Sequence, residues 1–137
     1  MKSSIKLLVV VDTNIFISGL VWGGKPRKIL ESWLKSKFTL LMSPYLVFEI
    51  VSTYKDFPNP EIDVEKLKLY LQTKTHKITP SKKINICRDE KDNQILDLCF
   101  AGTADYLITG DKDLLVIKKF GKTKITKPKE FLKIISG

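Results

Sequence analysis

Carboxylate residues follow two separate apolar segments of this sequence, where they could do chemistry together. Asp12 comes directly after the run Ile5–Val11, and Asp111 follows the run Tyr106–Thr109 by two residues, with Asp113 two residues further on. Each run has the composition of a buried strand. Because ligands of open α/β sheets bind beyond the carboxyl ends of the strands, these acids are candidates for one site.

Two further acids lie in segments with helical spacing. Glu49 occurs in SPYLVFEIVSTY, where it shares a stripe with Tyr45, Ser52 and Thr53. Asp92 lies in the first turn of a helix predicted for residues 89–101, on the face that carries apolar residues. If Asp89 caps this helix, the Asp92 side chain is available for another role.

Each acid also has an ordinary structural interpretation. Aspartate is a favoured N-cap, so Asp12 and Asp111 could each do no more than begin a helix. The stripe that contains Glu49 could be the solvated face of its helix. The fact that two strands deliver acids to the same edge weakens the capping interpretation but does not remove it.

If Asp12, Glu49, Asp92 and Asp111 converge, their mutual repulsion makes the metal-free site costly and raises some of their pKa values. A divalent cation removes that cost. Oxygen ligands without histidine or thiolate select Mg²⁺ or Mn²⁺ over zinc. Such a site is suited to hydrolysing a phosphodiester.

Apolar runs alternate with helical patterns along the whole chain, which predicts βαβ units around a parallel sheet. The first strand is followed by a predicted turn, and Ser43-Pro44 is a strong helix start. Strands are expected at 5–11, 38–42, 77–80 (a weak edge strand), 106–109 and 122–126, and helices at 26–35, 43–54, 60–75, 89–101, 111–119 and 128–135.

Length and charge limit the class of protein. A chain of 137 residues without a repeat or linker is expected to form a single domain, residues 1–137. No apolar run approaches the ~20 residues of a membrane helix, and the apolar run near the start lacks a cleavage site, so a cytoplasmic protein is expected. The net charge of +9 favours a polyanionic partner, such as nucleic acid or an acidic protein.

The cysteine and histidine content argues against other chemistry. Cys87 and Cys99 lie 12 residues apart with no histidine beside them, which favours reduced thiols over a disulfide or a zinc site. His76 is the only histidine, so a multi-histidine metal site is excluded. Histidine-based nucleophilic catalysis would depend on His76 alone and is not expected.

Four blocks of the sequence, in order, resemble the motifs of the PIN domain family. They are VVVDTNIFISGL (9–20), SPYLVFEI (43–50), CRDEKDNQILDLC (87–99) and ADYLITGDKDLL (104–115). The resemblance spans essentially the whole chain and is strongest to the PIN toxin components of toxin–antitoxin modules. It implies a three-layer α/β/α fold with a central parallel sheet of about five strands.

The resemblance also implies the site residues. Asp12, Glu49, Asp92 and Asp111 match the four acidic metal ligands and catalytic residues of the family, and Asn14, Thr109 and Asp113 match its supporting residues. Asp89 and Asp97 are alternatives for the third acid. Asp92 is preferred because Asn93 and the apolar residues after it match the family pattern.

Three other α/β classes fit less well. A haloacid-dehalogenase-type phosphatase needs a second acid where this chain has Asn14. A receiver-type phospho-acceptor needs acids clustered near the first strand and a late lysine, and the spacing here does not match. A dinucleotide-binding fold needs a glycine fingerprint, which SGLVWGGK does not supply.

The expected function is therefore a metal-dependent ribonuclease that acts on single-stranded RNA with Mg²⁺ or Mn²⁺, as the toxin of a toxin–antitoxin module. A PIN nuclease of RNA processing and a non-catalytic RNA-binding module are the alternatives. The resemblance suggests an antitoxin partner and a homodimer. Candidate RNA-binding residues are Arg27, Lys112, Lys118, Lys119, Lys122 and Lys124, although any one of them could simply be solvated. Trp22 could stack on a base or belong to the core or to a dimer contact.

Overall fold

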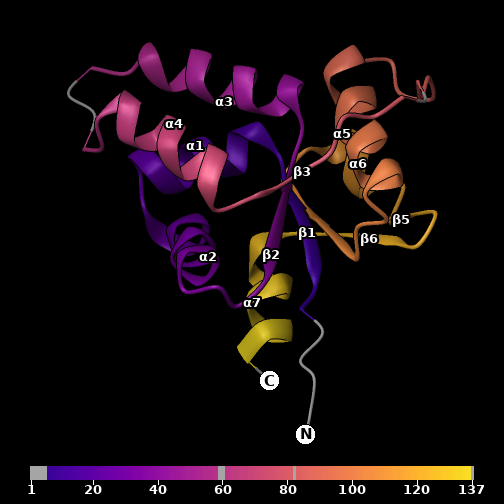
Figure 1. The fold of residues 1–137 in the computed structure, drawn as a ribbon. Coiled ribbons are helices and arrows are strands. Elements are labelled where there is room, and N and C mark those ends of the chain that lie inside the picture. The colour runs from indigo at the N-terminus through magenta and orange to yellow at the C-terminus, as the bar shows by residue number, and fades with distance from the viewer. Residues whose placement is uncertain (1–5, 59–60, 82, 137) are drawn as a thin grey trace, which may run out of the picture.

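Five parallel strands and one antiparallel strand form the central sheet (Figure 1). The structure, a computed structural model, describes residues 6–58, 61–81 and 83–136. The strands are β1 (Leu8–Val11), β2 (Thr39–Met42), β3 (His76–Lys77), β4 (Tyr106–Ile108), β5 (Lys119–Phe120) and β6 (Thr123–Thr126). Their order in the sheet is β3-β2-β1-β4-β6-β5, and only β5 runs antiparallel to its neighbour.

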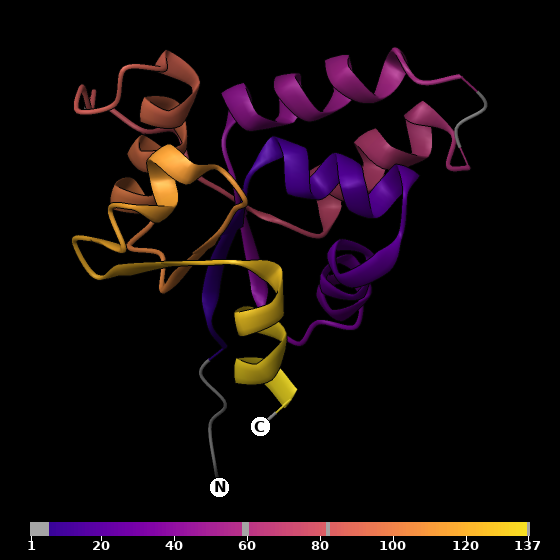
Figure 2. The same cartoon turned by 180° about the vertical axis from the view of Figure 1, so that it is seen from behind.

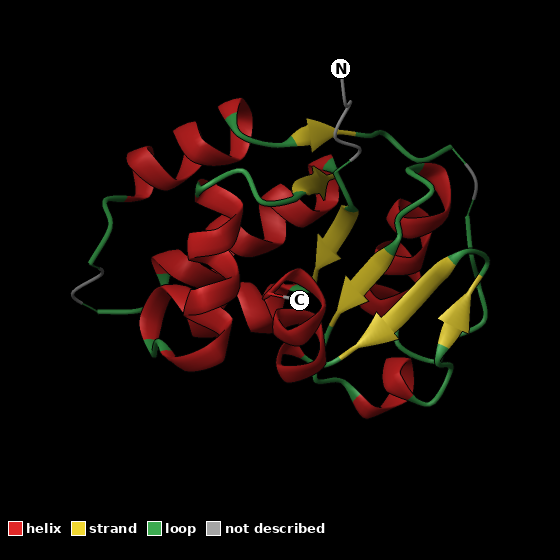
Figure 3. Cartoon of the chain, turned by 90° about the horizontal axis from the view of Figure 1, so that it is seen from below, coloured by secondary structure: helices red, strands yellow, loops and turns green. Residues whose placement is uncertain are grey.

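Seven helices in the described part of the chain cover the two faces of this sheet (Figures 2 and 3). They are α1 (Thr13–Val21), α2 (Gly24–Leu34), α3 (Pro44–Lys55), α4 (Val64–Thr73), α5 (Glu90–Ala101), α6 (Lys112–Leu115) and α7 (Pro128–Ser136). Helix α2 packs on α1 and α7, α3 packs on α1 and α4, and α5 contacts β1. The predicted three-layer α/β/α architecture is confirmed.

None of the helices within residues 6–58, 61–81 and 83–136 is long and apolar enough to cross a bilayer.

The core is built from continuous apolar strands. Val9, Val10 and Val11 of β1 are fully buried, as are Leu40, Leu41 and Met42 of β2. This is the pattern of parallel strands that are covered by helices on both faces. The two strands therefore lie at the centre of the molecule, and their carboxyl ends open onto one edge of the sheet.

The register at that edge sets up the site. Val11 of β1 pairs with Ile108 of β4, and Ile108 also pairs with Thr126 of β6. The Asp12 amide then donates to the Ile108 carbonyl at 3.1 Å. The residues that follow β1 and β4 therefore leave the sheet side by side.

Two predicted helix starts are confirmed by their caps. The Ser43 hydroxyl accepts a hydrogen bond from the Leu46 amide at 3.2 Å, with Pro44 in the first turn of α3. The Asp89 carboxylate accepts from the Lys91 amide at 3.0 Å and caps α5. These local signals are reliable because the capping side chain and its amide partner lie within three residues of each other.

Helix α1 corrects the predicted turn after the first strand. The segment TNIFISGLV contains β-branched residues and Gly19, which have modest helix propensity. It is helical because Asp12 caps it and because its apolar face packs on α2, where the Phe16 and Trp33 rings lie 5.5 Å apart. Tertiary packing supplies most helical stability in proteins, and that packing is not visible in a local pattern.

The segment 111–119 was predicted as one helix, and this was wrong. Helix α6 ends at Leu115, and Lys118 takes a positive φ of 66° before β5 begins. The pairing of β5 with β6 is a tertiary contact, which explains why helical periodicity missed it. The helix predicted for residues 60–75 begins at Val64 in the structure, and the start signal Asn59-Pro60 lies outside the described residues.

Candidate metal centre

A hollow of about 350 Å³ lies at the carboxyl edge of the sheet. Segments from α1, α3, α5 and the start of α6 line it: Asp12, Thr13, Asn14, Tyr45, Glu49, Thr53, Asp89, Lys91, Asp92, Ile95 and Asp111. All four predicted acids and Asn14 are among these residues. We call this hollow the acid pocket.

Asp12 caps α1 and also lines the acid pocket. Its Oδ1 accepts from the Ile15 amide at 2.9 Å and caps α1, while its Oδ2 accepts from the hydroxyl of Thr109. Burial raises the pKa of Asp12 to about 6, and the charge of Asp111 adds to the rise, against the lowering effect of the two hydrogen bonds. One side chain therefore both caps α1 and lines the acid pocket.

Thr109 joins the ends of β1 and β4. It is fully buried, its hydroxyl donates to Asp12, and its Oγ1 accepts from the Asp111 amide at 3.0 Å. Thr109 therefore positions Asp12 and Asp111 with respect to each other. A supporting role of Thr109 in a metal site stays a prediction.

Asp92 is the least satisfied acid of the pocket. It lies in the first turn of α5, is 6% exposed, and its Oδ2 is buried without a hydrogen-bond partner among the described residues. Burial raises the pKa of Asp92 to about 7, and the neighbouring Asp111 carboxylate adds to the rise. A buried acceptor without a donor is costly in a folded protein, so this oxygen is free to accept a ligand from outside the chain.

Asp111 and Asp113, at the start of α6, lie close to Asp92. Oδ1 of Asp111 accepts from the Asp113 amide at 2.9 Å, which caps α6. Carboxylate oxygens of Asp92, Asp111 and Asp113 all lie within 4.8 Å of one another. We call these three residues the acid cluster. Asp113, predicted as a supporting acid, is thus part of the cluster itself.

Glu49 enters the acid pocket from α3, together with Tyr45 and Thr53 from the same helical stripe. Its Oε1 lies 3.8 Å from Nζ of Lys91. Burial, followed by the charge of Glu49, raises the pKa of Tyr45 to about 12. The stripe that could have been a solvated face therefore lines the pocket.

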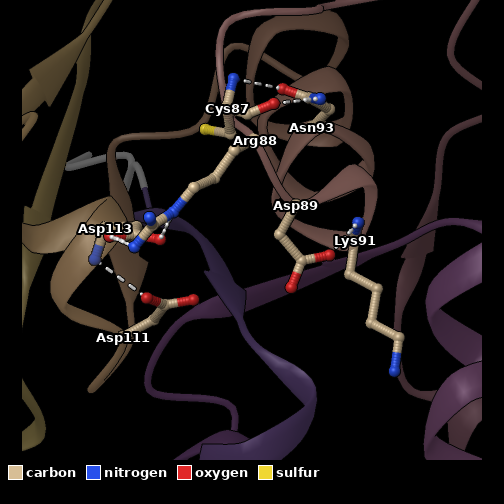
Figure 4. Close-up of polar contacts among 7 residues, drawn as sticks. All are labelled: Cys87, Arg88, Asp89, Lys91, Asn93, Asp111 and Asp113. Carbon is tan, nitrogen blue, oxygen red and sulfur yellow. Dashed lines mark hydrogen bonds and ion pairs between the residues drawn. The ribbon is translucent and has the colours of Figure 1, made fainter.

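The segment before α5 carries a basic residue that the sequence reasoning did not select. Arg88 reaches across to α6, where its Nε and Nη2 donate to the Asp113 carboxylate at 3.1 and 3.3 Å (Figure 4). The bidentate pair raises the pKa of Arg88. Lys91, only three residues later, pairs with Glu49 on the other side of the pocket. No local pattern indicates these partners, because each pair joins segments far apart in the chain.

Asn93 holds the backbone before α5 in place. Its Oδ1 accepts from the amides of Ile86 and Cys87 at 3.2 and 2.9 Å, and its Nδ2 donates to the Cys87 carbonyl at 3.0 Å (Figure 4). Asn93 is 1% exposed. In the sequence, Asn93 indicates only which acid matches the motif. In the structure it holds the backbone of Ile86 and Cys87.

The donor chemistry of the acid pocket fits a divalent cation. The clustered ligands are carboxylate oxygens, two of the acids have raised pKa values, and one buried oxygen of Asp92 has no partner in the described chain. A hard cation such as Mg²⁺ or Mn²⁺ prefers oxygen ligands. Its positive charge would favour the ionised carboxylates and so offset both the burial and the repulsion that raise these pKa values.

The predicted RNA-binding residues are scattered. Arg27 donates to the Gly19 and Leu20 carbonyls at the end of α1 and pairs with Glu61, so its guanidinium is used within the fold. Lys122 pairs with Asp105, which precedes β4 and therefore lies at the opposite edge of the sheet from the acid pocket.

The other lysines lie on or near α6 and the last strands. Lys112 is the first residue of α6, beside Asp111. Lys119 of β5 lies opposite Lys124 of β6 in the antiparallel register, and Lys118 directly precedes β5. Of the predicted basic residues, Lys112 is therefore the one that directly follows an acid of the pocket in the sequence.

The cysteines and Trp22 bring no further chemistry to the acid pocket. Cys87 and Cys99 are free thiols, as predicted, and Cys99 is fully buried. Trp22 is 76% exposed at the end of α1 and meets the Phe57 ring edge-on, with centroids 6.4 Å apart. It is therefore not a core residue.

Comparisons with known proteins agree with this fold. The model of a family described as PIN domain matches residues 8–113. The chain is 32% identical over 142 residues to uncharacterized protein MJ1680 of Methanocaldococcus jannaschii, in an alignment that covers 93% of this chain and 91% of that protein.

A solved structure has a similar fold. It is the crystal structure of VapBC2 from Rickettsia felis bound to a DNA fragment from their promoter, with a TM-score of 0.59 and 18% identity. The superposition covers 87% of this chain and 97% of that chain. At this level of identity the likeness concerns the fold.

Proposed function

Because the chain belongs to the PIN domain family, a family of nucleases, we propose that it is a divalent-metal-dependent endoribonuclease that hydrolyses single-stranded RNA. The observation that carries the proposal is the acid cluster of Asp92, Asp111 and Asp113, in which the buried Oδ2 of Asp92 has no partner within the described chain. A cluster of this kind destabilises the fold unless a cation occupies it. Mg²⁺ or Mn²⁺ is the proposed cofactor.

Asp12, Asp92 and Asp111 would hold the cation, with Glu49 completing the pocket from α3. When bound, a divalent cation stabilises negative charge on a phosphodiester and makes water a better nucleophile. Thr109 keeps Asp12 and Asp111 in position through its two hydrogen bonds. Asn14 and Asp113 are the proposed supporting residues. The expected products carry 5′-phosphate and 3′-hydroxyl ends.

The toxin role is a further part of the proposal. The similar structure from Rickettsia felis is of VapBC2 bound to DNA from their promoter. By analogy, an antitoxin is the proposed partner here, a homodimer is the proposed assembly, and the protein is proposed to act in the cytoplasm. Expression without an antitoxin should slow growth. Normal growth during active expression would instead favour the alternative, an RNA-processing PIN nuclease.

Cleavage of single-stranded RNA tests the enzymatic proposal. Asp12→Asn and Asp111→Asn remove ligand charge and preserve shape. Each should lower activity by more than about 100-fold, because losing a residue that only orients a metal ligand already costs 10- to 100-fold. A chelator should abolish wild-type activity.

Asp105→Asn is the matched control, since Asp105 lies at the other end of β4 and outside the acid pocket. It should cleave RNA like the wild type. Full activity of Asp12→Asn and Asp111→Asn, or of wild type in chelator, contradicts the proposed function.

A further inference from the structure

A second hollow, of about 370 Å³, adjoins the acid cluster on the side of α6. It is lined by Ile86, Cys87, Arg88, Asp113, Val116 and Ile117. Asp113 belongs both to this hollow and to the acid cluster, and its amide donates to Asp111. A molecule in the second hollow is therefore next to whatever the acid cluster holds.

Arg88 gives the second hollow a cationic group. Its side chain is 86% exposed, and its guanidinium is held on Asp113 by two hydrogen bonds. A guanidinium has five N–H donors in a planar fork that suits phosphate. The Asp113 pair thus orients Arg88 and leaves donors that can face a phosphate.

The rest of the second hollow is mainly apolar. Ile86, from the segment before α5, is 62% exposed, Val116, at the end of α6, is 73% exposed, and Ile117 is half-buried. Exposed aliphatic side chains next to an arginine match a ligand that has both a flat apolar part and a phosphate. A nucleotide has both, since its base presents an apolar face and its phosphate is anionic.

One wall of the second hollow is held by a buried side chain rather than by a loose loop. Asn93 binds the amides of Ile86 and Cys87 and the carbonyl of Cys87, so the backbone that precedes Arg88 is fixed (Figure 4). Binding sites need this kind of support to hold their contact residues in place.

We propose that the second hollow is a nucleotide subsite, which binds the RNA residue next to the phosphate at the acid cluster, with Arg88 on a flanking phosphate and Ile86 and Val116 against the base. The proposal rests on the proposed function, because it places this subsite along the same RNA strand. The N–H donors of Arg88 that Asp113 does not use, and the position of the second hollow beside the acid cluster, favour RNA over an apolar peptide as the occupant.

Binding of RNA tests the subsite without relying on cleavage. The probe is a fluorescein-labelled single-stranded oligouridylate, and its anisotropy is measured with Ca²⁺ over a range of salt concentrations. Arg88→Ala should weaken binding about 10-fold, and the slope of log K against log salt should fall by about 0.7, as expected for one lost phosphate contact on a single strand.

Lys68→Ala is the matched control for Arg88→Ala. Lys68 also forms an exposed ion pair, with Glu65 on α4 at 3.3 Å, but it lies outside both hollows. Its affinity and salt slope should equal those of wild type. If Arg88→Ala and Lys68→Ala behave alike, Arg88 does not bind phosphate and the subsite proposal is wrong.

Two charge variants of Val116 test whether this side chain contacts the RNA. Because Val116 is exposed and helical in conformation, glutamate and lysine are both accommodated there. Val116→Glu should weaken RNA binding severalfold, and Val116→Lys should not weaken it. Equal affinities for the two variants would contradict this contact.

Cys87 offers a direct measure of occupancy. It is half-buried within the second hollow, whereas Cys99 is fully buried, so alkylation of the folded protein reports on Cys87. Oligouridylate should slow this alkylation severalfold in wild type and much less in Arg88→Ala. Unchanged alkylation at saturating RNA overturns the subsite. Protection of Cys87 without any cleavage by wild type would support the subsite and contradict the nuclease proposal.

Discussion

Asp105 precedes β4 and Asp111 follows it, so one short strand carries a carboxylate at each edge of the sheet. Asp105 is satisfied within the chain: its Oδ2 accepts from the Leu8 amide at 2.8 Å and its Oδ1 lies 3.1 Å from Nζ of Lys122. At the other edge, Asp111 faces the carboxylates of Asp92 and Asp113 within 4.8 Å.

The difference separates an acid that the fold compensates from one that it leaves among other acids. Asp105 joins β1, β4 and Lys122, and its charge is balanced by the fold. At the carboxyl edge, Lys91 pairs with Glu49 and Arg88 pairs with Asp113, but burial leaves Asp12 and Asp92 with raised pKa values. A folded protein keeps such an arrangement at the expense of stability, which is common at functional sites.

The largest expected effect concerns two buried threonines. Thr109 donates to Asp12 at the carboxyl edge, and Thr123 donates to the Ala104 carbonyl at 2.7 Å near the opposite edge. Thr109→Val should reduce RNA cleavage about 10- to 100-fold, because it removes the hydroxyl that orients Asp12 and Asp111. Thr123→Val should keep activity and lose about 1–3 kcal/mol of stability, because it leaves a buried carbonyl unpaired.

The two threonine variants are compared by initial cleavage rates and by urea unfolding. Similar activities in Thr109→Val and Thr123→Val would show that Thr109 has only a structural role.

Metal binding should separate two buried acids of the same helix. Asp92 lacks a partner on Oδ2, whereas Asp97 accepts from the Ile84 amide. At 100 times its Kd, Mn²⁺ should stabilise wild type by about 2.7 kcal/mol, seen as a rise in Tm of several degrees. The rise should persist in Asp97→Asn and be largely lost in Asp92→Asn.

This measurement also addresses the third acid, for which the sequence left Asp97 open as an alternative. A Tm shift that is lost in Asp97→Asn and kept in Asp92→Asn would reverse that assignment.

The metal-free acid pocket should make the protein less stable as pH rises. The folded-state pKa values of Asp12 and Asp92, about 6 and about 7, exceed the ordinary value of 3.8. Between pH 4 and 7 the folded state therefore binds more protons than the unfolded state, and the free energy of unfolding falls as these protons leave. In chelator, we expect a loss on the order of 2 kcal/mol between pH 5 and pH 8.

Asp92→Asn removes one of the two titrating groups. Its metal-free form should therefore lose less stability over this range, and at pH 8 its free energy of unfolding should exceed that of wild type. Asp105→Asn should retain the wild-type pH dependence. The free energies come from urea unfolding at each pH, and a wild-type curve that rises towards pH 8 contradicts the pKa assignment.

The smallest effect is expected at the opposite edge. Lys122→Ala removes an ion pair whose lysine side chain is 56% exposed. Exposed pairs contribute about 0–1 kcal/mol, so the midpoint of urea unfolding should change little, and less at high salt. A loss of several kcal/mol would show that the pair of Lys122 and Asp105 stabilises the fold far more than an exposed ion pair does.

Much of the fold was predictable because its signals are local. Continuous valines identify β1, Ser43-Pro44 begins α3, and Asp89 caps α5. Helix α1 and strand β5 were missed because both depend on partners distant in the chain: α1 packs on α2, and β5 pairs with β6.

The candidate acids were also predictable, since each lies at a strand end or on a definable helix face and matches a motif. The partners of these acids were not. Arg88 meets Asp113 and Lys91 meets Glu49 only because α3, α5 and α6 converge. Likewise, no pattern in the sequence distinguishes Lys112, beside the acids, from Lys122 at the far edge.

The sequence by itself determined the α/β class, the buried strands and the identity of the acids, because hydrophobic periodicity, caps and strand ends are encoded within a few residues. The tertiary structure alone decided which acids are compensated. Compensation depends on burial and on charges brought together from distant segments, which is why Asp105 and Asp111, six residues apart, have different environments. One carboxylate is balanced by the fold, and the other belongs to a cluster suited to a cation.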